Sequence, residues 1–314
     1  MGRYKFVAGV KGRRARIKTR KGIRLRDAGI TKQTQSRYYL AVREVSHLID
    51  KCDSFPELDS KVADWIEYKF EHGYPINVVA DCLSGIHFFL PLCRRQLPES
   101  WKLFGVWRKI EVPSRAPPIT TDLLMAMASR ALSINRVDFA TLLLLGFHCF
   151  LRTGELLTIT PNDLLLGSKR GVVRLPVSKG KTRRHATESV TIEDPRVIMV
   201  AKTLVDIRAS QNLLKVPIWQ ASGSAFRQTF YRFVNYFDIG HLGFRCYSLR
   251  RGGATAYFAE CGLMEKTLLR GRWGSTSVAR IYICDALAQL PTLKARPTTI
   301  ALMEKHSLLS PQKG

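Results

Sequence analysis

Three short segments place charged or phenolic side chains beside an apolar helix or a tight turn, where an uncompensated charge is costly. The first, Phe150-Leu-Arg-Thr-Gly-Glu-Leu156, follows a strongly apolar stretch. The second is Tyr247-Ser-Leu-Arg-Arg-Gly-Gly-Ala254, and the third is Gly271-Arg-Trp-Gly-Ser275, followed by Arg280-Ile-Tyr282. A guanidinium is always charged and can bind an oxyanion through two parallel hydrogen bonds, and a phenol can act as a nucleophile. Together, the segments contain side chains that can bind an anion and phenols that can act as nucleophiles.

The segments resemble the sequence boxes of the tyrosine recombinases, the phage integrase-like superfamily. In that family an Arg lies in a Gly-Leu-Arg-x-x-Glu turn, which Phe150-Leu-Arg152-Thr-Gly-Glu155 is similar to. The family's Lys lies on a β-hairpin that reads Gly-Lys-Gly-x-Lys, and Ser178-Lys179-Gly-Lys181 resembles it. The resemblance covers residues 34–290 and is strong only at the boxes.

Two further boxes extend the resemblance toward the C-terminus. The family's His-x-x-Arg box is similar to Tyr247-Ser-Leu-Arg250, and its His or Trp stands nine residues before the nucleophilic Tyr, as Trp273 stands before Tyr282. The 23-residue separation of Arg250 from Trp273 is also typical of the family. The wording of these boxes resembles most the recombinases of eukaryotic mobile elements of the Crypton and DIRS-like groups.

The resemblance implies an enzyme that cleaves and rejoins DNA strands through a 3′-phosphotyrosyl intermediate, in DNA recombination or integration. No cofactor and no metal are expected. The catalytic set that it implies is Arg152, Lys179, Tyr247, Arg250, Trp273 and Tyr282. The supporting residues are Glu155, Lys181 and Arg251.

Each role has a physical reason. A free phenol with a pKa near 10 is about three units from ionised at neutral pH, which costs about 4 kcal/mol, so cations must stabilise the attack. Arg152 and Arg250 would bind the non-bridging oxygens, each contributing about 4 kcal/mol at 4 Å and an effective dielectric constant near 20. Lys179, or Lys181 in its place, would protonate the leaving 5′ oxygen, and Trp273 Nε1 would donate a hydrogen bond to the phosphate.

At the family's His position this chain has Tyr247, which is neither a cation nor a base near pH 7. Three outcomes are open: a phenol suffices, cleavage is weakened, or His241 or His185 takes the role. Loss of catalysis would leave a domesticated DNA-binding protein. A type IB topoisomerase is a further alternative, because it uses similar Arg, Lys and Tyr chemistry.

Each site residue also has a structural interpretation, in which it has no catalytic role. Arg152 with Glu155 would be a helix-end ion pair, Arg250 and Lys179 solvated cations, and Trp273 and Tyr282 packing residues.

The chain of 314 residues carries a formal net charge of +25 and has a pI near 10.2, unlike a typical metabolic enzyme. Residues 1–37 hold 13 Lys or Arg and one Asp. The arm, residues 1–33, has too few apolar residues to fold alone, so we expect it to be disordered until it binds an anion. Its expected DNA-binding residues are Arg13, Arg14, Arg16, Lys18, Arg20 and Lys21. The arm could also serve nuclear import, although a bacterial cytoplasm stays open.

Apolar periodicity predicts the elements that must position the site. Helical spacing over 38–49, 62–70 and 78–90 indicates a bundle of about four helices at 34–112, which by resemblance is a core-binding (SAM-like) DNA-binding domain. The proline-rich residues 113–118 predict a linker. The catalytic domain, 119–309, is predicted to be mainly helical, with apolar helices near 121–132 and 139–149 and a β-hairpin at 171–177 and 188–192. The fold class is therefore mainly α with a small β-sheet, which by resemblance is the DNA-breaking-rejoining enzyme fold.

The expected partner is double-stranded DNA, with no membrane. By resemblance, the chain forms a dimer on one site and a tetramer in synapsis. The tail, residues 286–309, carries an apolar stripe that could pack on a neighbouring protomer or fold back on its own domain; its members are Ile300, Leu302, Met303 and Leu308. The seven cysteines form no Cys-x-x-Cys pair, so we expect reduced thiols rather than disulfides or a zinc site.

Overall fold

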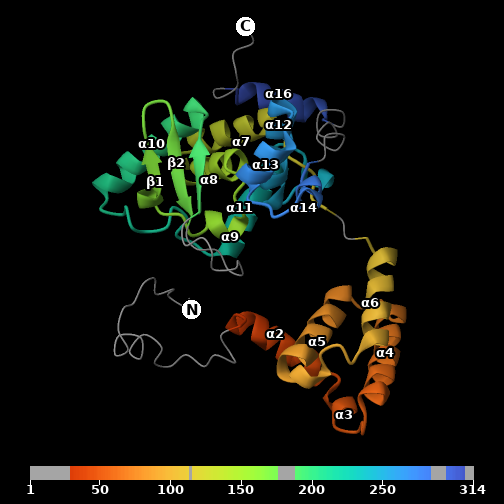
Figure 1. Cartoon of the computed structure of the whole chain (residues 1–314). Helices are drawn as coiled ribbons and strands as arrows, with labels where there is room; N and C mark the ends of the chain where they lie inside the picture. Colours follow the sequence, from red (N-terminus) through yellow and green to blue (C-terminus); the bar gives the residue numbers. More distant parts are fainter. Residues whose placement is uncertain (1–28, 113–114, 176–187, 284–294, 308–314) are drawn as a thin grey trace, which may run out of the picture. The chain divides into compact units, whose positions relative to one another are not determined.

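The computed structural model describes residues 29–112, 115–175, 188–283 and 295–307, which form two compact units divided between residues 114 and 115 (Figure 1). Several sequence predictions lie outside the described residues. They are the six basic arm residues Arg13, Arg14, Arg16, Lys18, Arg20 and Lys21, the hairpin residues Lys179, Lys181 and His185, and Leu308. No helix of the described part is long and apolar enough to cross a membrane.

The first unit is helical. Its helices are α2 (Lys32–Arg43), α3 (Ser46–Ile49), α4 (Phe55–Glu71), α5 (Ile76–Phe89) and α6 (Pro98–Ile110), with a 3₁₀ turn η1 (Pro91–Cys93). Thr31 and Ser54 accept hydrogen bonds from backbone N–H groups in the first turns of α2 and α4, which fixes where those helices begin. The helical pattern over 38–49 belongs to two helices rather than one. The chain leaves helical geometry at Val45, whose side chain is fully buried in the core of the unit.

The second unit combines helices with a small sheet. Its elements are α7 (Thr121–Ser133), α8 (Val137–His148), α9 (Thr153–Leu156), β1 (Leu164–Leu166), β2 (Gly171–Leu175), β3 (Glu188–Ile192), α10 (Pro195–Ser210), α11 (Gly223–Tyr236), α12 (Tyr247–Cys261), α13 (Met264–Gly271), α14 (Thr276–Arg280) and α16 (Pro297–Lys305), with 3₁₀ turns η2 (Pro161–Asp163) and η3 (Gly240–Leu242). The three strands form an antiparallel sheet in the order β1-β2-β3, seen side by side in Figure 1. The predicted mainly helical fold with a small sheet is confirmed.

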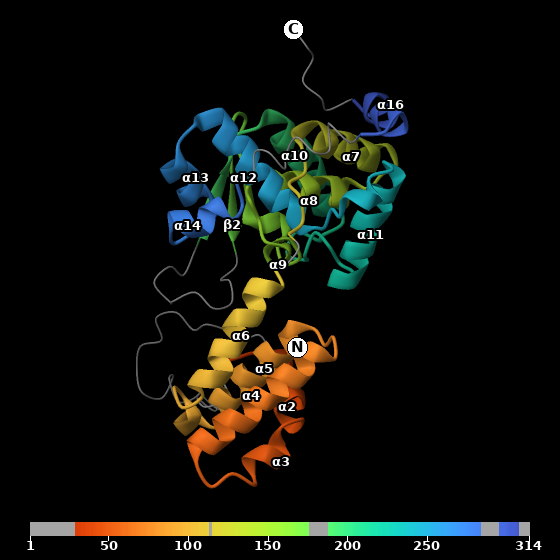
Figure 2. The ribbon, with the colours of Figure 1, turned by 90° about the vertical axis from the view of Figure 1, so that its right-hand side faces the viewer.

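Helix α8 is the centre of the second unit. Every residue from Phe139 to Phe147 is buried, and the helix contacts α7, α10 and α12 (Figure 2). A helix that is apolar on all sides has to be surrounded by other elements. As a result, the C-terminal end of α8 lies inside the unit, where its last carbonyl groups need partners from neighbouring helices.

Two adjacent glycines let α12 approach neighbouring backbone, Gly253 at the end of α8 and Gly252 at the residue Ile119 before α7. A Cβ atom on Gly253 would lie 1.9 Å from the carbonyl oxygen of Phe147, and one on Gly252 would lie 2.1 Å from that of Ile119. Backbone atoms cannot move aside as a flexible side chain can, so only glycine fits at these two positions. Gly253 therefore sets how closely α12 packs against the end of α8, and Gly252 how closely α12 packs against the chain before α7.

Replacing Gly253 with alanine is expected to lower the free energy of unfolding by about 3 kcal/mol, the upper part of the range for overpacked sites. Thermal or urea unfolding of the full chain measures it. The matched control is Gly154→Ala, because a Cβ at Gly154 meets nothing within 4 Å. Equal stability of the two variants would show that α12 does not depend on this close approach.

The tail helix α16 folds back on its own unit. Leu302 and Met303 pack against the main core, and the Thr299 hydroxyl donates to the carbonyl oxygen of Phe237 at 2.9 Å. Tyr236 and His306 are joined by a hydrogen bond of 2.9 Å between Oη and Nε2. Of the two arrangements that the sequence allowed, the structure has this one, in which α16 contacts α7. Ile300 stays exposed.

The cysteines of the described part are free thiols, as expected. Four of them are buried: Cys82, Cys93, Cys149 and Cys246. Burial raises the pKa of Cys149 to about 12, so this thiol stays protonated although it lies next to the arginines described below.

Candidate active site

The chain turns sharply where α8 ends. The N–H of Leu151 donates to the Gly146 carbonyl at 3.1 Å and that of Phe150 to the Phe147 carbonyl at 3.2 Å, which is a Schellman motif. Phe150 has a φ of 48°, a left-handed value that favours glycine. The family motif that this segment resembles has glycine there. Here the ring of Phe150 is buried and stacks against Trp273, with centroids 6.2 Å apart, so packing stabilises a strained backbone.

Arginines from α12 and α13 donate hydrogen bonds to the backbone carbonyl groups at this turn. Arg250 Nη1 donates to the carbonyl oxygen of Phe150, and Arg270 Nη2 donates to that of His148 at 2.9 Å. The C-terminal end of a helix carries a partial negative charge, so cations are favourable there. The end of α8 thus gathers guanidinium groups from α12 and α13 at one point.

Glu155 joins two more arginines to this turn. Its Oε1 accepts from Arg152 Nη1 at 2.8 Å and its Oε2 accepts from Arg272 Nη2 at 2.7 Å. Glu155 is buried, whereas the side chain of Arg152 is 35% exposed. The carboxylate therefore fixes the guanidinium of Arg152 while leaving part of it open to a ligand.

Arg272, like Arg270, is a residue of this site that the sequence reasoning missed. It pairs with Glu155 and, through Nε at 3.3 Å, with Glu188 at the start of β3. Its φ of 56° is again left-handed, which costs an arginine about 1 kcal/mol, and the two ion pairs offset that cost. An arginine beside Trp273 in a box already singled out was the only signal in the sequence.

Arg250 is a buried cation without a carboxylate partner. The residue is 0% exposed, Nη2 donates to the Gly271 carbonyl at 2.6 Å, and Nε has no hydrogen-bond partner in the described part of the chain. No carboxylate of the described residues lies within ion-pair distance of Arg250. Burial lowers the pKa of Arg250 below its usual value, and the charges of Arg152 and Arg272 lower it further. Such a group is costly unless an anion joins it.

Two aromatic rings lie against this guanidinium. The Arg250 Cζ atom is 5.1 Å from the ring centroid of Trp273 and 5.3 Å from that of Tyr282, and the two ring centroids are 4.6 Å apart. Gly271 makes room for them, since a Cβ there would lie 2.2 Å from the indole. The indole N–H of Trp273 is buried and has no partner among the described residues, so one more donor at this site is unused.

Tyr282 follows α14 and is held by its backbone. Its N–H donates to the Ala279 carbonyl at 2.9 Å, and its own carbonyl accepts from Thr255 Oγ1 at 3.3 Å. The hydroxyl of Tyr247, at the start of α12, donates a hydrogen bond to the hydroxyl of Tyr282. The structure thus brings four sequence-predicted residues into contact, Tyr247, Arg250, Trp273 and Tyr282, with Arg152 near enough for its charge to act on Tyr247 and Arg250.

Other predicted residues are not part of this cluster. Arg251 is buried and its Nη1 donates to the carbonyl oxygen of Ala116 at 2.5 Å, so it anchors the start of the second unit instead. His241 lies exposed on η3, where its charge acts on Asp238. His241 is thus not among the groups whose charges act on Tyr247 or Arg250. His185, the other histidine considered as a replacement for the family His, lies outside the described residues.

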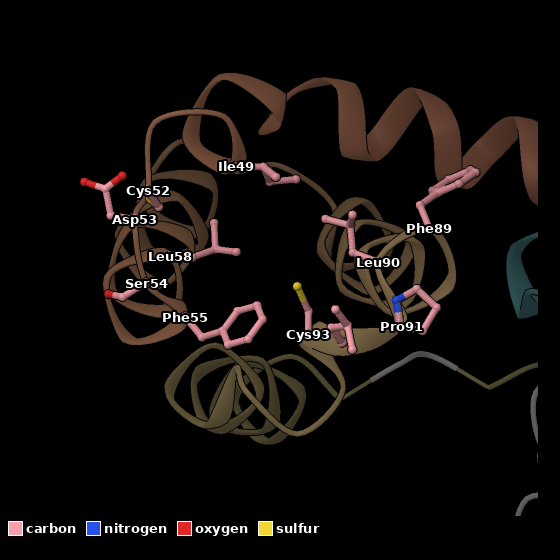
Figure 3. A pocket seen from close by; sticks show the side chains of 11 residues that line it. Ile49, Cys52, Asp53, Ser54, Phe55, Leu58, Phe89, Leu90, Pro91 and Cys93 are labelled. Atoms are coloured by element: carbon pink, nitrogen blue, oxygen red, sulfur yellow. The ribbon is translucent and has the colours of Figure 1, made fainter.

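A cavity of about 350 Å³ lies in the first unit (Figure 3). Its lining is mostly apolar, with Leu58, Phe55 and Leu90 around it, and Asp53 is its one charged residue. It lacks the paired charges that phosphate chemistry requires, so the candidate site is the arginine and tyrosine cluster of the second unit. Among the described residues, no group of three or more His, Cys, Asp or Glu is arranged to hold a metal ion.

Solved structures share the arrangement of these elements. The integrase of transposon Tn1549, in complex with transposon right-end DNA, aligns over 89% of this chain and 97% of that chain, with a TM-score of 0.59 and 13% identity. The chain has the tyrosine recombinase fold. A lambda integrase dimer bound to a COC′ core site has this fold too, aligning over 83% of this chain and 74% of that one, with a TM-score of 0.52 and 15% identity.

A lambda integrase tetramer bound to a Holliday junction shares the tyrosine recombinase fold as well, with a TM-score of 0.52, 14% identity, and coverage of 82% of this chain and 73% of that chain. No family model and no curated protein sequence matches the chain. The likeness therefore lies in the backbone arrangement rather than in the sequence. The finer resemblance to Crypton and DIRS-like recombinases stays a prediction.

Proposed function

We propose that this chain is a site-specific DNA recombinase that cleaves and rejoins strands through a covalent bond between Tyr282 and a 3′ phosphate. The observation that carries the proposal is the buried guanidinium of Arg250, which has no carboxylate partner and lies against the ring of Tyr282. The tyrosine recombinase fold of the chain supports it. The solved proteins with this fold were captured on DNA, one as a dimer and one as a tetramer.

A phosphodiester would complete the unsatisfied groups. A guanidinium has five N–H donors, and the two contacts of Arg250 with carbonyl groups leave three of them for a ligand. The buried N–H of Trp273 is a further donor, and Arg152, paired with Glu155, keeps part of its side chain exposed. Charge-assisted bonds of this kind are about twice as strong as neutral ones. A singly charged phosphate also neutralises the charge buried at Arg250.

The reaction balances without an external reagent. The Oη of Tyr282 forms a bond to phosphorus while the bond from phosphorus to the 5′ oxygen breaks. The phenol of Tyr282 gives its proton to water as it attacks, and the departing 5′ oxygen takes a proton from an ammonium group. We assign that ammonium group to Lys179, with Lys181 as the alternative, both in the segment that joins β2 to β3, and the lysine regains a proton from solvent. The reverse steps rejoin the strand, so the energy of the broken bond is kept in the phosphotyrosyl linkage.

A nicked suicide duplex tests the proposal, because loss of the short fragment beyond the nick prevents rejoining. The full chain, incubated with a pool of such duplexes of random sequence, should give a covalent protein–DNA band on a denaturing gel. Peptide mapping should locate the nucleotide on Tyr282. A chain that binds DNA without forming this band is an inert DNA-binding protein, and plasmid relaxation without exchange between sites would indicate a topoisomerase instead.

DNA binding by this basic chain should weaken steeply with salt, because Lys and Arg contacts release counterions from the duplex. Residues 1–28 hold 11 Lys or Arg and one Asp, and their deletion leaves Thr31 in place to cap α2. The slope of log K against log salt should become less steep by about 0.9 for each phosphate that the arm neutralises in the full chain. Filter binding at several salt concentrations measures it. An unchanged slope would show that the arm does not contact DNA.

A further inference from the structure

Tyr247, at the position that corresponds to the family His, is a second phenol, and it lies beside Tyr282, the proposed nucleophile. Tyr247 is the first residue of α12 and Tyr282 follows α14, with ring centroids 5.6 Å apart. The hydroxyl of Tyr247 donates a hydrogen bond to the Tyr282 hydroxyl. A role for Tyr247 in binding the phosphate alone would not require this hydrogen bond to the Tyr282 oxygen.

We propose that Tyr247 is a positioning residue that acts on the nucleophile: its hydroxyl holds Tyr282 Oη in place and stabilises the negative charge that develops there as the phenol loses its proton. The proposal rests on the function proposed above. It gives the substitution of His by Tyr a specific consequence, since a phenol can still donate one hydrogen bond although it cannot act as a base near pH 7.

Burial and hydrogen bonding keep the proton on Tyr247. Burial, and then the hydrogen bond with Tyr282, raise the pKa of Tyr247 above its usual value, while the nearby cations Arg250 and Arg152 lower it by less. These two arginines and Tyr282 are the titratable or charged groups of the described part that act on Tyr247; the hairpin with Lys179 and Lys181 lies outside it. Tyr247 therefore stays protonated, and so stays a donor, throughout the pH range of strand cleavage.

The ring of Tyr282 lies over the guanidinium of Arg250, whose Cζ is 5.3 Å from the ring centroid, and the Tyr282 oxygen, which becomes negative during the attack, accepts the Tyr247 hydrogen bond. A hydrogen bond to a charged group is the stronger kind, and its loss is expected to slow cleavage by about 10- to 100-fold. Without the donor, the phenolate is less stable, so a more alkaline solution is required for the same fraction of ionised nucleophile. The defect should thus be largest at neutral pH and decrease as pH rises.

Single-turnover cleavage of the nicked duplex between pH 6 and 10 tests this for Tyr247→Phe, Tyr247→His and the control Tyr231→Phe, an exposed tyrosine on α11. The Phe variant should reach its maximal rate at a higher pH than the wild type. The His variant, which retains an N–H donor, should recover most of the rate. A Phe variant with an unshifted pH profile and a uniformly lower rate would refute the proposal.

A substrate with sulfur in place of the bridging 5′ oxygen separates effects on the nucleophile from effects on the leaving group. A thiolate leaves without taking up a proton, so this substrate does not need an acid at the leaving group. The Tyr247→Phe defect should persist on this duplex, since Tyr247 acts on the nucleophile. If the sulfur abolished the defect, Tyr247 would be acting on the leaving group and the proposal would be wrong.

An NMR measurement without DNA tests the pairing of Tyr247 with Tyr282 independently of whether the chain cleaves DNA. In protein labelled with ¹³C at tyrosine Cζ, the Tyr282 resonance is identified by its loss in Tyr282→Phe. It should shift in Tyr247→Phe and not in Tyr231→Phe. A Tyr282 resonance unmoved by loss of the Tyr247 hydroxyl would show that the phenols are not paired, whether or not the chain cleaves DNA.

Discussion

The Tyr282→Phe variant is expected to form no covalent complex with DNA, whereas its DNA binding stays close to that of the wild type. The substitution removes the one oxygen that would bond to phosphorus and keeps the ring, which packs against Trp273 with centroids 4.6 Å apart. Binding should persist because Arg152, Arg250 and the indole N–H stay in place. Denaturing gels of trapped complexes and filter binding on the same duplex measure the two properties.

The matched control for this change is Tyr231→Phe, which removes a hydroxyl from an exposed ring on α11. It should form the covalent complex as the wild type does. A covalent band that persists in Tyr282→Phe would mean that another side chain is the nucleophile, and the site described above would then have to be reassigned.

The second large effect is expected from Arg250→Ala, which should slow cleavage by about 10²- to 10³-fold, the cost of removing one preorganised donor to a developing negative charge. Arg250→Lys should recover little, because an ammonium group cannot bind two carbonyl oxygens and a phosphate in one plane. Single-turnover cleavage rates at saturating protein measure the loss.

Arg250→Ala also removes a buried side chain, so a control has to separate lost folding from lost catalysis. Arg251→Ala is matched to it, since Arg251 is equally buried on the same helix and donates to a carbonyl oxygen, that of Ala116. Both variants should unfold at lower temperature than the wild type. At a temperature where both are folded, only Arg250→Ala should lose most of its cleavage, and equal losses would count against a phosphate-binding role for Arg250.

Much of the candidate site could be predicted from the sequence because its residues lie in short motifs, close together along the chain. The pairing of Arg152 with Glu155 depends on a three-residue spacing within one turn, and the spacing of Trp273 from Tyr282 spans a single helix and its ends. Local geometry fixes such distances whatever the rest of the chain does. The fold class followed equally well, because the helical periodicity and the two predicted strands are local patterns.

What sequence reasoning missed depends on contacts between distant segments. Arg272 looks like a surface cation in the sequence, and only the buried Glu155 shows that it belongs to the site. Strand β1 was missed because its three leucines carry no β-branched residue, and its strand conformation comes from pairing with β2. The sequence left open whether the tail helix packs on its own domain or on a neighbour, and the structure has it on its own unit, in contact with α7.

The sequence by itself determined which side chains are present for phosphate chemistry, their order along the chain and the excess of positive charge. Only the tertiary structure decided that Arg250 is buried without a carboxylate and that the oxygens of Tyr247 and Tyr282 meet. The physical reason is that motif spacing fixes a residue's place on its own helix. Where two helices touch is set by backbone packing over long separations, here by the end of α8, its capping arginines and the glycines of α12.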